Sequence, residues 1–260
     1  MNLSSILGIC FGITVMYHAL IGTSKDLSFF FDLHGVLIVF GGTIAAASIS
    51  FSITDVLSLL KIFLLRVLGG HNSNPAKIVN QILDLNKKIS LGDIKTDELV
   101  STIKHPFLAE SVSLMITGVF SEAELRETIE QRIKTLEEYY LKQANMFRTI
   151  GRFPPAFGLL ATTLGMIGLL QKIGQPDSQK LIGPAMSVGL IGTLYGITLA
   201  NLILIPIAEN LTERAHEEIS LRKLILEGTL LLKTQTNPLS IREKLNSFLL
   251  PKKRVKKLVR

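Results

Sequence analysis

Thr162 and Thr193 each lie in a long segment that contains no charged residue. Small residues accompany them at helical spacing: Gly158, Ala161 and Gly165 in the first segment, and Gly189, Gly192 and Gly196 in the second. In a membrane, small residues at this spacing let two helix backbones approach each other closely. A threonine hydroxyl in such a helix can bond to a carbonyl of its own helix, or it can line a polar path. The pattern therefore supports two interpretations, helix packing alone and a polar path between the helices.

The chain lacks the residue patterns that most enzymes need. It contains no Ser/His/Asp grouping, no G-x-G-x-x-G loop and no G-x-x-x-x-G-K-[ST] phosphate loop. Its five histidines have no HExxH-like spacing, and a single cysteine, Cys10, excludes an intramolecular disulfide and a cysteine metal cluster. We therefore expect neither an enzyme nor a bound metal or cofactor.

The composition indicates a chain that is part membrane protein and part soluble. Hydrophobic residues make up 47% of the 260 residues and charged residues only 19%, against about a quarter in soluble domains. Four segments approach the roughly 20 apolar residues that a bilayer requires, namely 3–21, 33–51, 154–173 and 182–208. The first has the length of a signal peptide, but no Lys or Arg precedes its apolar run. The prediction is an all-α membrane protein with four transmembrane helices.

Basic residues predict how these spans are oriented. Residues 52–153 carry 13 Lys and Arg residues and residues 209–260 carry 12, whereas the loops 22–32 and 171–180 carry one and two. Because basic residues accumulate on the cytoplasmic side of membrane proteins, both large segments and both termini are expected in the cytoplasm.

The cytoplasmic segment 52–153 is predicted to form a helical domain between spans two and three. Residues 75–89 repeat apolar side chains at helical spacing, and Pro106 suits the first turn of a second helix. Ser121 and Glu124 have the spacing of a capping box that begins a third helix. No part of the chain has the pattern of a strand of any length.

The cytoplasmic tail 209–260 is predicted to continue the fourth span as one long amphipathic helix, with a break at 236–238. Its end, "PKKRVKKLVR" (251–260), carries six basic residues. In a chain anchored in a bilayer, such a segment favours contact with anionic lipid over nucleic acid. A solvated, disordered end is the alternative.

In spans three and four, the apolar stretches 154–170 and 182–208 contain no Asp, Glu, Lys, Arg or His. A protein that moves protons or sodium usually keeps an ionisable group inside the membrane. Either this chain moves no ions, or a partner supplies the carboxylate.

Two stretches carry a resemblance to a known family. "PPAFGLLATTLGMIGLL" (154–170) and "LIGPAMSVGLIGTLYGITLANLILIPIAENL" (181–211) resemble the MotA/PomA family of flagellar stator subunits. The resemblance implies a pentamer in the bacterial inner membrane around a dimer of a MotB/PomB-type protein, which brings the ion-binding aspartate. It also implies that H+ or Na+ flow through the complex produces torque on the rotor.

The resemblance assigns roles to four residues of the spans. Pro155 and Pro206 match prolines that the family links to the coupling of ion passage to movement. Pro206 removes a backbone hydrogen bond and favours a kink, whereas Pro155 also suits a plain helix start. Thr162 and Thr193 match threonines that lie near the ion path in sodium-type members. Proton-type members carry threonine there as well, so the choice of H+ or Na+ stays open.

The family also presents charged residues to the rotor protein FliG. The matching segment here is "NKKISLGDIKTDEL" (86–99), in which Lys87 and Lys88 fall near the basic position and Asp97 or Glu98 near the acidic one. The spacing differs by about a residue from the family pattern, and a solvated helix face is the alternative.

Two other function classes remain open at this point. An ExbB/TolQ-type energiser of envelope processes has three spans and its large cytoplasmic segment after the first, whereas this chain has two apolar segments before residue 52. A membrane scaffold or solute carrier is the other class. The lack of inverted repeats and of charge inside the membrane disfavours a carrier.

Overall fold

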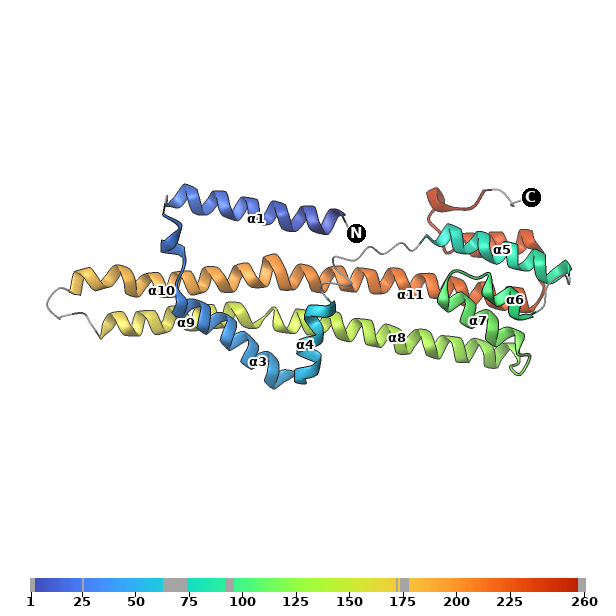
Figure 1. The fold of residues 1–260 in the computed structure, drawn as a ribbon, viewed down its shortest axis with the longest axis horizontal. Helices are drawn as coiled ribbons and strands as arrows, with labels where there is room; N and C mark the ends of the chain where they lie inside the picture. The colour runs from blue at the N-terminus through green and yellow to red at the C-terminus, as the bar shows by residue number, and fades with distance from the viewer. Residues whose placement is uncertain are drawn as a thin grey trace. The chain divides into compact units, whose positions relative to one another are not determined.

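The computed structural model describes residues 3–24, 26–62, 74–91, 96–171, 173 and 178–256. Within these residues every regular element is a helix and none is a strand (Figure 1). The chain divides into two compact units. The first unit consists of Met1–His71 and Leu141–Thr212, and the second of Asn72–Tyr140 and Glu213–Arg260.

The first unit is built from apolar helices. Its elements are α1 (Leu3–Thr23), η1 (Leu27–Phe30), α2 (Leu33–Val36), η2 (Leu37–Gly41), α3 (Gly42–Ser50), α4 (Ile53–Ile62), α9 (Phe153–Leu170), α10 (Ser178–Thr198) and η4 (Leu199–Leu204). The end of α8 (Glu122–Ile150) and the start of α11 (Ile205–Lys233) complete it. α9 and α10 lie side by side along their lengths and form the main contact of this unit (Figure 1).

Three helical stretches of the described residues are long and apolar enough to cross a membrane: Leu27–Ser50, Glu122–Leu170 and Ile182–Lys233. α1 contains a shorter apolar stretch, Cys10–Thr23. The last two candidate spans each continue into a long charged helix, because α8 leads into α9 and α10 leads through η4 into α11. The prediction that span four continues into the tail as one long helix is confirmed.

A π-helix interrupts span four where the sequence predicts a kink. Within η4, the N–H of Ile205 bonds to the carbonyl of Ala200, five residues back. Pro206 follows directly, and a proline cannot donate to the carbonyl four residues before it. The local distortion therefore takes the form of a wide π-turn, which keeps the helix continuous.

The second unit is a bundle of amphipathic helices. It contains α5 (Pro75–Leu91), α6 (Thr96–Ser101), α7 (Pro106–Ile116), most of α8 and α11, α12 (Pro238–Asn246) and the short η5 (Pro251–Lys253). Its core joins the apolar stripe of α5 to those of α7, α8, α11 and α12. The largest side chains that are completely buried there are Ile82, Leu108, Leu125, Ile129, Leu224, Ile225, Leu232, Ile241 and Leu245.

The capping box predicted at the start of α8 is confirmed. The N–H of Ser121 donates to Glu124 Oε2 at 2.8 Å, and the N–H of Glu124 lies 3.3 Å from Ser121 Oγ. The hydrogen bond with Ser121 lowers the pKa of the Glu124 carboxyl. Two of the N–H groups that the first turn leaves without intrahelical partners are thereby satisfied.

Candidate functional site

The contact between α9 and α10 is made by small residues on both helices. A Cβ atom added to Gly158 would lie 2.8 Å from the carbonyl oxygen of Gly192, and one added to Gly189 would lie 2.8 Å from Thr162 Cα. Gly192 packs in the same way against the methyl group of Ala161, which is fully buried. The two backbones are therefore as close as the absence of side chains allows.

The N-terminal turn of α9 is the other close approach of this helix pair. Gly196 faces the backbone carbonyl of Pro154, and an added Cβ would overlap that oxygen and crowd Pro155 Cα. Pro154 is buried and Pro155 half-buried, whereas Pro206 on α11 is exposed. Gly165, the remaining small residue predicted at this contact, lies in α9 and is half-buried.

The two threonines of interest meet at the centre of this contact. Thr162 Oγ1 and Thr193 Oγ1 are 2.6 Å apart. Thr162 Oγ1 lies 2.9 Å from the carbonyl oxygen of Gly189 and 3.2 Å from that of Gly158. Thr193 Oγ1 lies 3.2 Å from both carbonyl oxygens. Four oxygen atoms, two from each helix, thus form one compact polar cluster.

The threonine cluster contains more short oxygen–oxygen contacts than hydroxyl protons that could form hydrogen bonds in them. Each hydroxyl carries a single proton and accepts further bonds, so two protons are shared among the five oxygen–oxygen contacts. Rotation about the Cβ–Oγ bonds of Thr162 and Thr193 redistributes these hydrogen bonds without any movement of the helices. The cluster is therefore a polar element with several equivalent states, embedded in an otherwise apolar interface.

α2 also packs on α10 near the threonine cluster, through contacts that the residue pattern alone does not predict. Tyr195 Oη donates to the carbonyl of Phe30 at 2.6 Å and lies 3.3 Å from the N–H of Asp32. Asp32 caps α2 by accepting from the N–H of Gly35 at 2.6 Å. Gly35 in turn lies against the backbone of Gly192, next to the threonine cluster. A tyrosine inside an uncharged span was the available signal, because a buried phenol normally finds a polar partner.

Arg148 connects the last turn of α8 to the first turns of α11. Its guanidinium donates to Glu209 Oε1 at 3.0 and 3.2 Å, to Asn145 Oδ1 at 2.7 Å and to Thr212 Oγ1 at 3.3 Å. Several hydrogen bonds from one planar guanidinium fix orientation better than a single ion pair does. The network sets the position of the two helices from which α9 and the η4 segment continue.

The charged residues predicted to contact a rotor lie in the second unit. Lys87 is exposed and Lys88 half-buried, both near the end of α5. Asp97 and Glu98 belong to α6, and their side chains lie outside the described residues.

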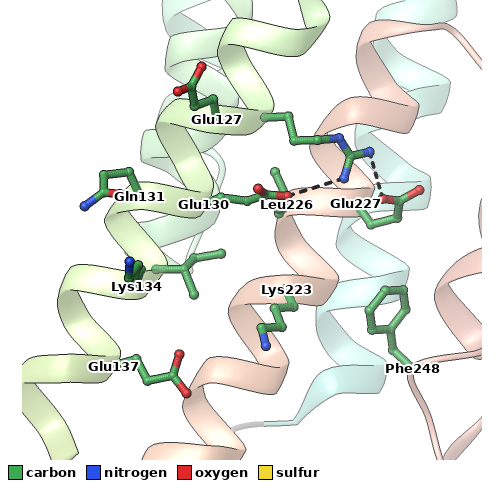
Figure 2. A pocket seen from close by; sticks show the side chains of 11 residues that line it. Glu127, Glu130, Gln131, Lys134, Glu137, Lys223, Leu226, Glu227 and Phe248 are labelled. Atoms are coloured by element: carbon green, nitrogen blue, oxygen red, sulfur yellow. Dashed lines mark hydrogen bonds and ion pairs between the residues drawn. The ribbon is translucent and has the colours of Figure 1, made fainter.

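A groove in the second unit runs between α8 and α11 (Figure 2). Arg126 bridges its two sides, at 3.7 Å from Glu130 on its own helix and 3.4 Å from Glu227 on α11. Lys134 and Lys223 also line it. Charges of both signs alternate around the groove, and it contains no nucleophile paired with a base among the residues that line it.

Replacing both cluster threonines with valine is expected to lower activity while the helix pair still assembles. Valine keeps the shape of threonine, and interhelical hydrogen bonds in membranes are worth only about 0.6 kcal/mol on average. We expect near-normal amounts of folded protein from Thr162→Val, Thr193→Val and the double variant. If the chain has the role in motility that its resemblance to flagellar stator subunits implies, cells that carry these variants should swim more slowly. The matched control is Thr163→Val, because the Thr163 hydroxyl is exposed and bonds only within its own helix, to the carbonyl of Leu159 at 3.0 Å. Normal swimming of the double variant would show that Thr162 and Thr193 contribute to helix packing alone.

Comparison with known proteins supplies the family. The MotA/TolQ/ExbB proton channel family matches residues 100–223. The chain is 29% identical over 257 residues to "Motility protein A" of Borreliella burgdorferi, covering 98% of this chain and 96% of that protein. It is 31% identical over 223 residues to "Uncharacterized protein YtxD" of Bacillus subtilis, covering 84% and 79%. The solved flagellar MotAB stator complex from Bacillus subtilis contains a chain of the same fold, with a TM-score of 0.85, 22% identity, and coverage of 96% and 98%.

The regular elements of the described residues are all helices, three helical stretches are long and apolar enough to cross a membrane, and α9 and α10 pack closely through small residues. These features are those of a helical membrane protein. The chain belongs to the MotA/TolQ/ExbB proton channel family. The resemblance seen in residues 154–170 and 181–211 is thereby confirmed, and the likeness to motility proteins extends over nearly the whole chain.

Proposed function

We propose that this chain is a flagellar motor stator subunit that couples transmembrane H+ or Na+ flow to torque. The observation that carries the proposal is the α9–α10 pair, in which a polar threonine cluster lies between two apolar stretches, 154–170 and 182–208, that contain no Asp, Glu, Lys, Arg or His. The nearly full-length similarity to Motility protein A supports it. An ion path built this way needs a carboxylate from outside the chain. A MotB/PomB-type partner with one membrane aspartate meets that need.

The proposed membrane arrangement has four spans, 3–21, 33–51, 154–173 and 182–208, in the bacterial inner membrane. Both termini and both large segments, 52–153 and 209–260, lie in the cytoplasm, in keeping with their basic residues. Copies of the chain, five by family resemblance, surround the partner dimer.

The helical second unit is proposed to contact the rotor protein FliG. Lys87 and Lys88 on α5 supply basic charge, and Asp97 and Glu98 on α6 supply acidic charge. Opposite charges on two protein surfaces accelerate docking and select the partner.

The test of the proposed function is ion flux in sealed vesicles. We expect no H+ or Na+ flux with this chain alone, and flux when it is assembled with its MotB-type partner, because the four proposed spans of this chain contain no Asp or Glu and the partner provides the membrane carboxylate. The control is the same complex with the partner's membrane aspartate changed to asparagine, which should be inactive. Robust flux from the chain alone would contradict the proposal that ion flow requires a carboxylate from the partner.

An ExbB/TolQ-type energiser belongs to the same family and is the second candidate. Deletion of the chain distinguishes the two functions. Loss of swimming with an intact envelope supports the stator, whereas envelope defects in cells that still swim would support the energiser.

A further inference from the structure

The basic end of the chain is held in place by one buried side chain. Asn246, the last residue of α12, is only 6% exposed. Its Nδ2 donates to the carbonyl of Val255 at 3.1 Å, and its Oδ1 accepts from the N–H of the same residue at 2.9 Å. The amide thus satisfies both backbone polar groups of Val255, as a neighbouring β-strand would.

Val255 points inward and the basic residues around it point outward. Its side chain is half-buried and packs against the core of the second unit. Lys252, Lys253, Arg254 and Lys256 are all exposed. The end of the chain up to residue 256 is therefore held against the second unit by Asn246 and Val255. It is not a solvated, disordered end over these residues.

α12 and the tail that follows it form a basic surface with exposed apolar side chains. Together, residues 238–256 contain six basic residues and one acidic residue, Glu243, which pairs with Arg242 at 2.9 Å. In the turn that leads to the tail, Phe248 and Leu250 are 47% and 69% exposed. Phe248 stands beside the α8–α11 groove, on the side of α11 (Figure 2). Exposed apolar side chains surrounded by charge are typical of a protein interface.

The same surface adjoins the helix that carries Lys87 and Lys88. α12 packs on α5, and Asn86 Nδ2 lies 3.5 Å from the carbonyl of Thr236, in the turn before α12. The helix that precedes the tail, α12, is thus packed on the element that the proposed function assigns to the rotor contact.

We propose that the docked tail, residues 248–256, is a second docking surface for an acidic face of the rotor protein. This inference rests on the proposed function for the identity of the partner. A surface that is already fixed in the free protein loses less conformational entropy when it binds a folded partner, because few of its side chains become ordered on binding. Contact with anionic lipid, by contrast, needs only accumulated charge near the membrane and does not account for a buried amide that fixes Val255.

The test compares removal of the charge with removal of the docking. One variant changes Lys252, Lys253, Arg254 and Lys256 to glutamine. A second, Asn246→Ala, leaves every charge in place and releases the backbone. Because Asn246 is buried, Val255→Pro provides a second way to release the tail, through loss of the N–H that donates to Oδ1. The control for total charge changes four exposed lysines outside the segment to glutamine, namely Lys61, Lys77, Lys104 and Lys142.

Binding of purified rotor protein to the stator complex in nanodiscs is the measurement, with swimming speed beside it. We expect the glutamine variant to bind about tenfold more weakly, since exposed charge pairs contribute about 0–1 kcal/mol each. Its binding should also depend less on salt. The two releasing variants should weaken binding several-fold at unchanged charge, and the control should bind normally.

The outcomes separate this inference from the proposed function. Rotor binding by the wild-type complex that is unchanged in all tail variants would overturn the docking surface and leave the stator function intact. No binding and no swimming defect on deletion of the chain would overturn both. Binding of wild-type protein to vesicles containing anionic lipid, lost in the glutamine variant while rotor binding persists, would assign the tail to lipid and overturn the inference.

Discussion

Cells that carry Gly196→Ala in this chain are expected to lose swimming, because the α9–α10 pair no longer closes. The added methyl group would overlap the carbonyl oxygen of Pro154, which belongs to a rigid helix backbone and cannot rotate away. Overpacking of this kind costs about 1–3 kcal/mol. Gly158→Ala, whose Cβ would lie 2.8 Å from the carbonyl of Gly192, should act in the same direction. The measurements are the thermal unfolding midpoint of the purified complex and the swimming speed.

An alanine substitution at an open position of α9 provides the control. Gly168 has nothing within 4 Å of an added Cβ. Alanine favours a helix by about 1 kcal/mol over glycine, so Gly168→Ala should keep or raise the unfolding midpoint. Equal behaviour of contact and control variants would show that close backbone approach is not what holds the pair.

Reversal of both α5 lysines, Lys87→Glu with Lys88→Glu, is expected to stop or severely slow swimming while the stator still assembles. Exposed ion pairs are each worth only about 0–1 kcal/mol, so single neutralisations should reduce swimming modestly. Reversal acts more strongly, since like charges across an interface repel and slow docking. Reversal of the matching acidic residues on the rotor protein should then restore swimming.

Lys88 is half-buried, so the double variant also needs a check of folding. Lys87→Glu alone changes only an exposed side chain and should show the same direction with a smaller effect. Lys104→Glu with Lys134→Glu carries the same change of net charge at two other exposed positions and should swim normally. Normal swimming of the Lys87→Glu, Lys88→Glu variant would show that these lysines lie on a solvated helix face and do not contact the rotor.

Local features of this protein could be predicted from its sequence. The apolar stripe of α5 and the capping box at Ser121 follow from spacing over a few residues, and both occur in the structure. The continuation of span four into the tail is also predicted, and α11 runs from Ile205 to Lys233 in the structure. Each of these depends on residues within one or two turns of one another, where periodicity and capping operate. The lysines and acidic residues of α5 and α6 stay predictions, because exposed charge specifies no partner by itself.

Only the tertiary structure decided which polar groups meet. The hydroxyls of Thr162 and Thr193 come from two helices and touch at 2.6 Å, and Tyr195 reaches the carbonyl of Phe30 across 165 positions of sequence. Asn246 likewise finds Val255 beyond the end of its own helix. Small residues at helical spacing predict that two helices pack closely. The register in which they pack is set by how the two surfaces fit together along their whole length. A shift of one residue would rotate a threonine by about 100° around its helix, so the polar cluster exists only in the assembled pair.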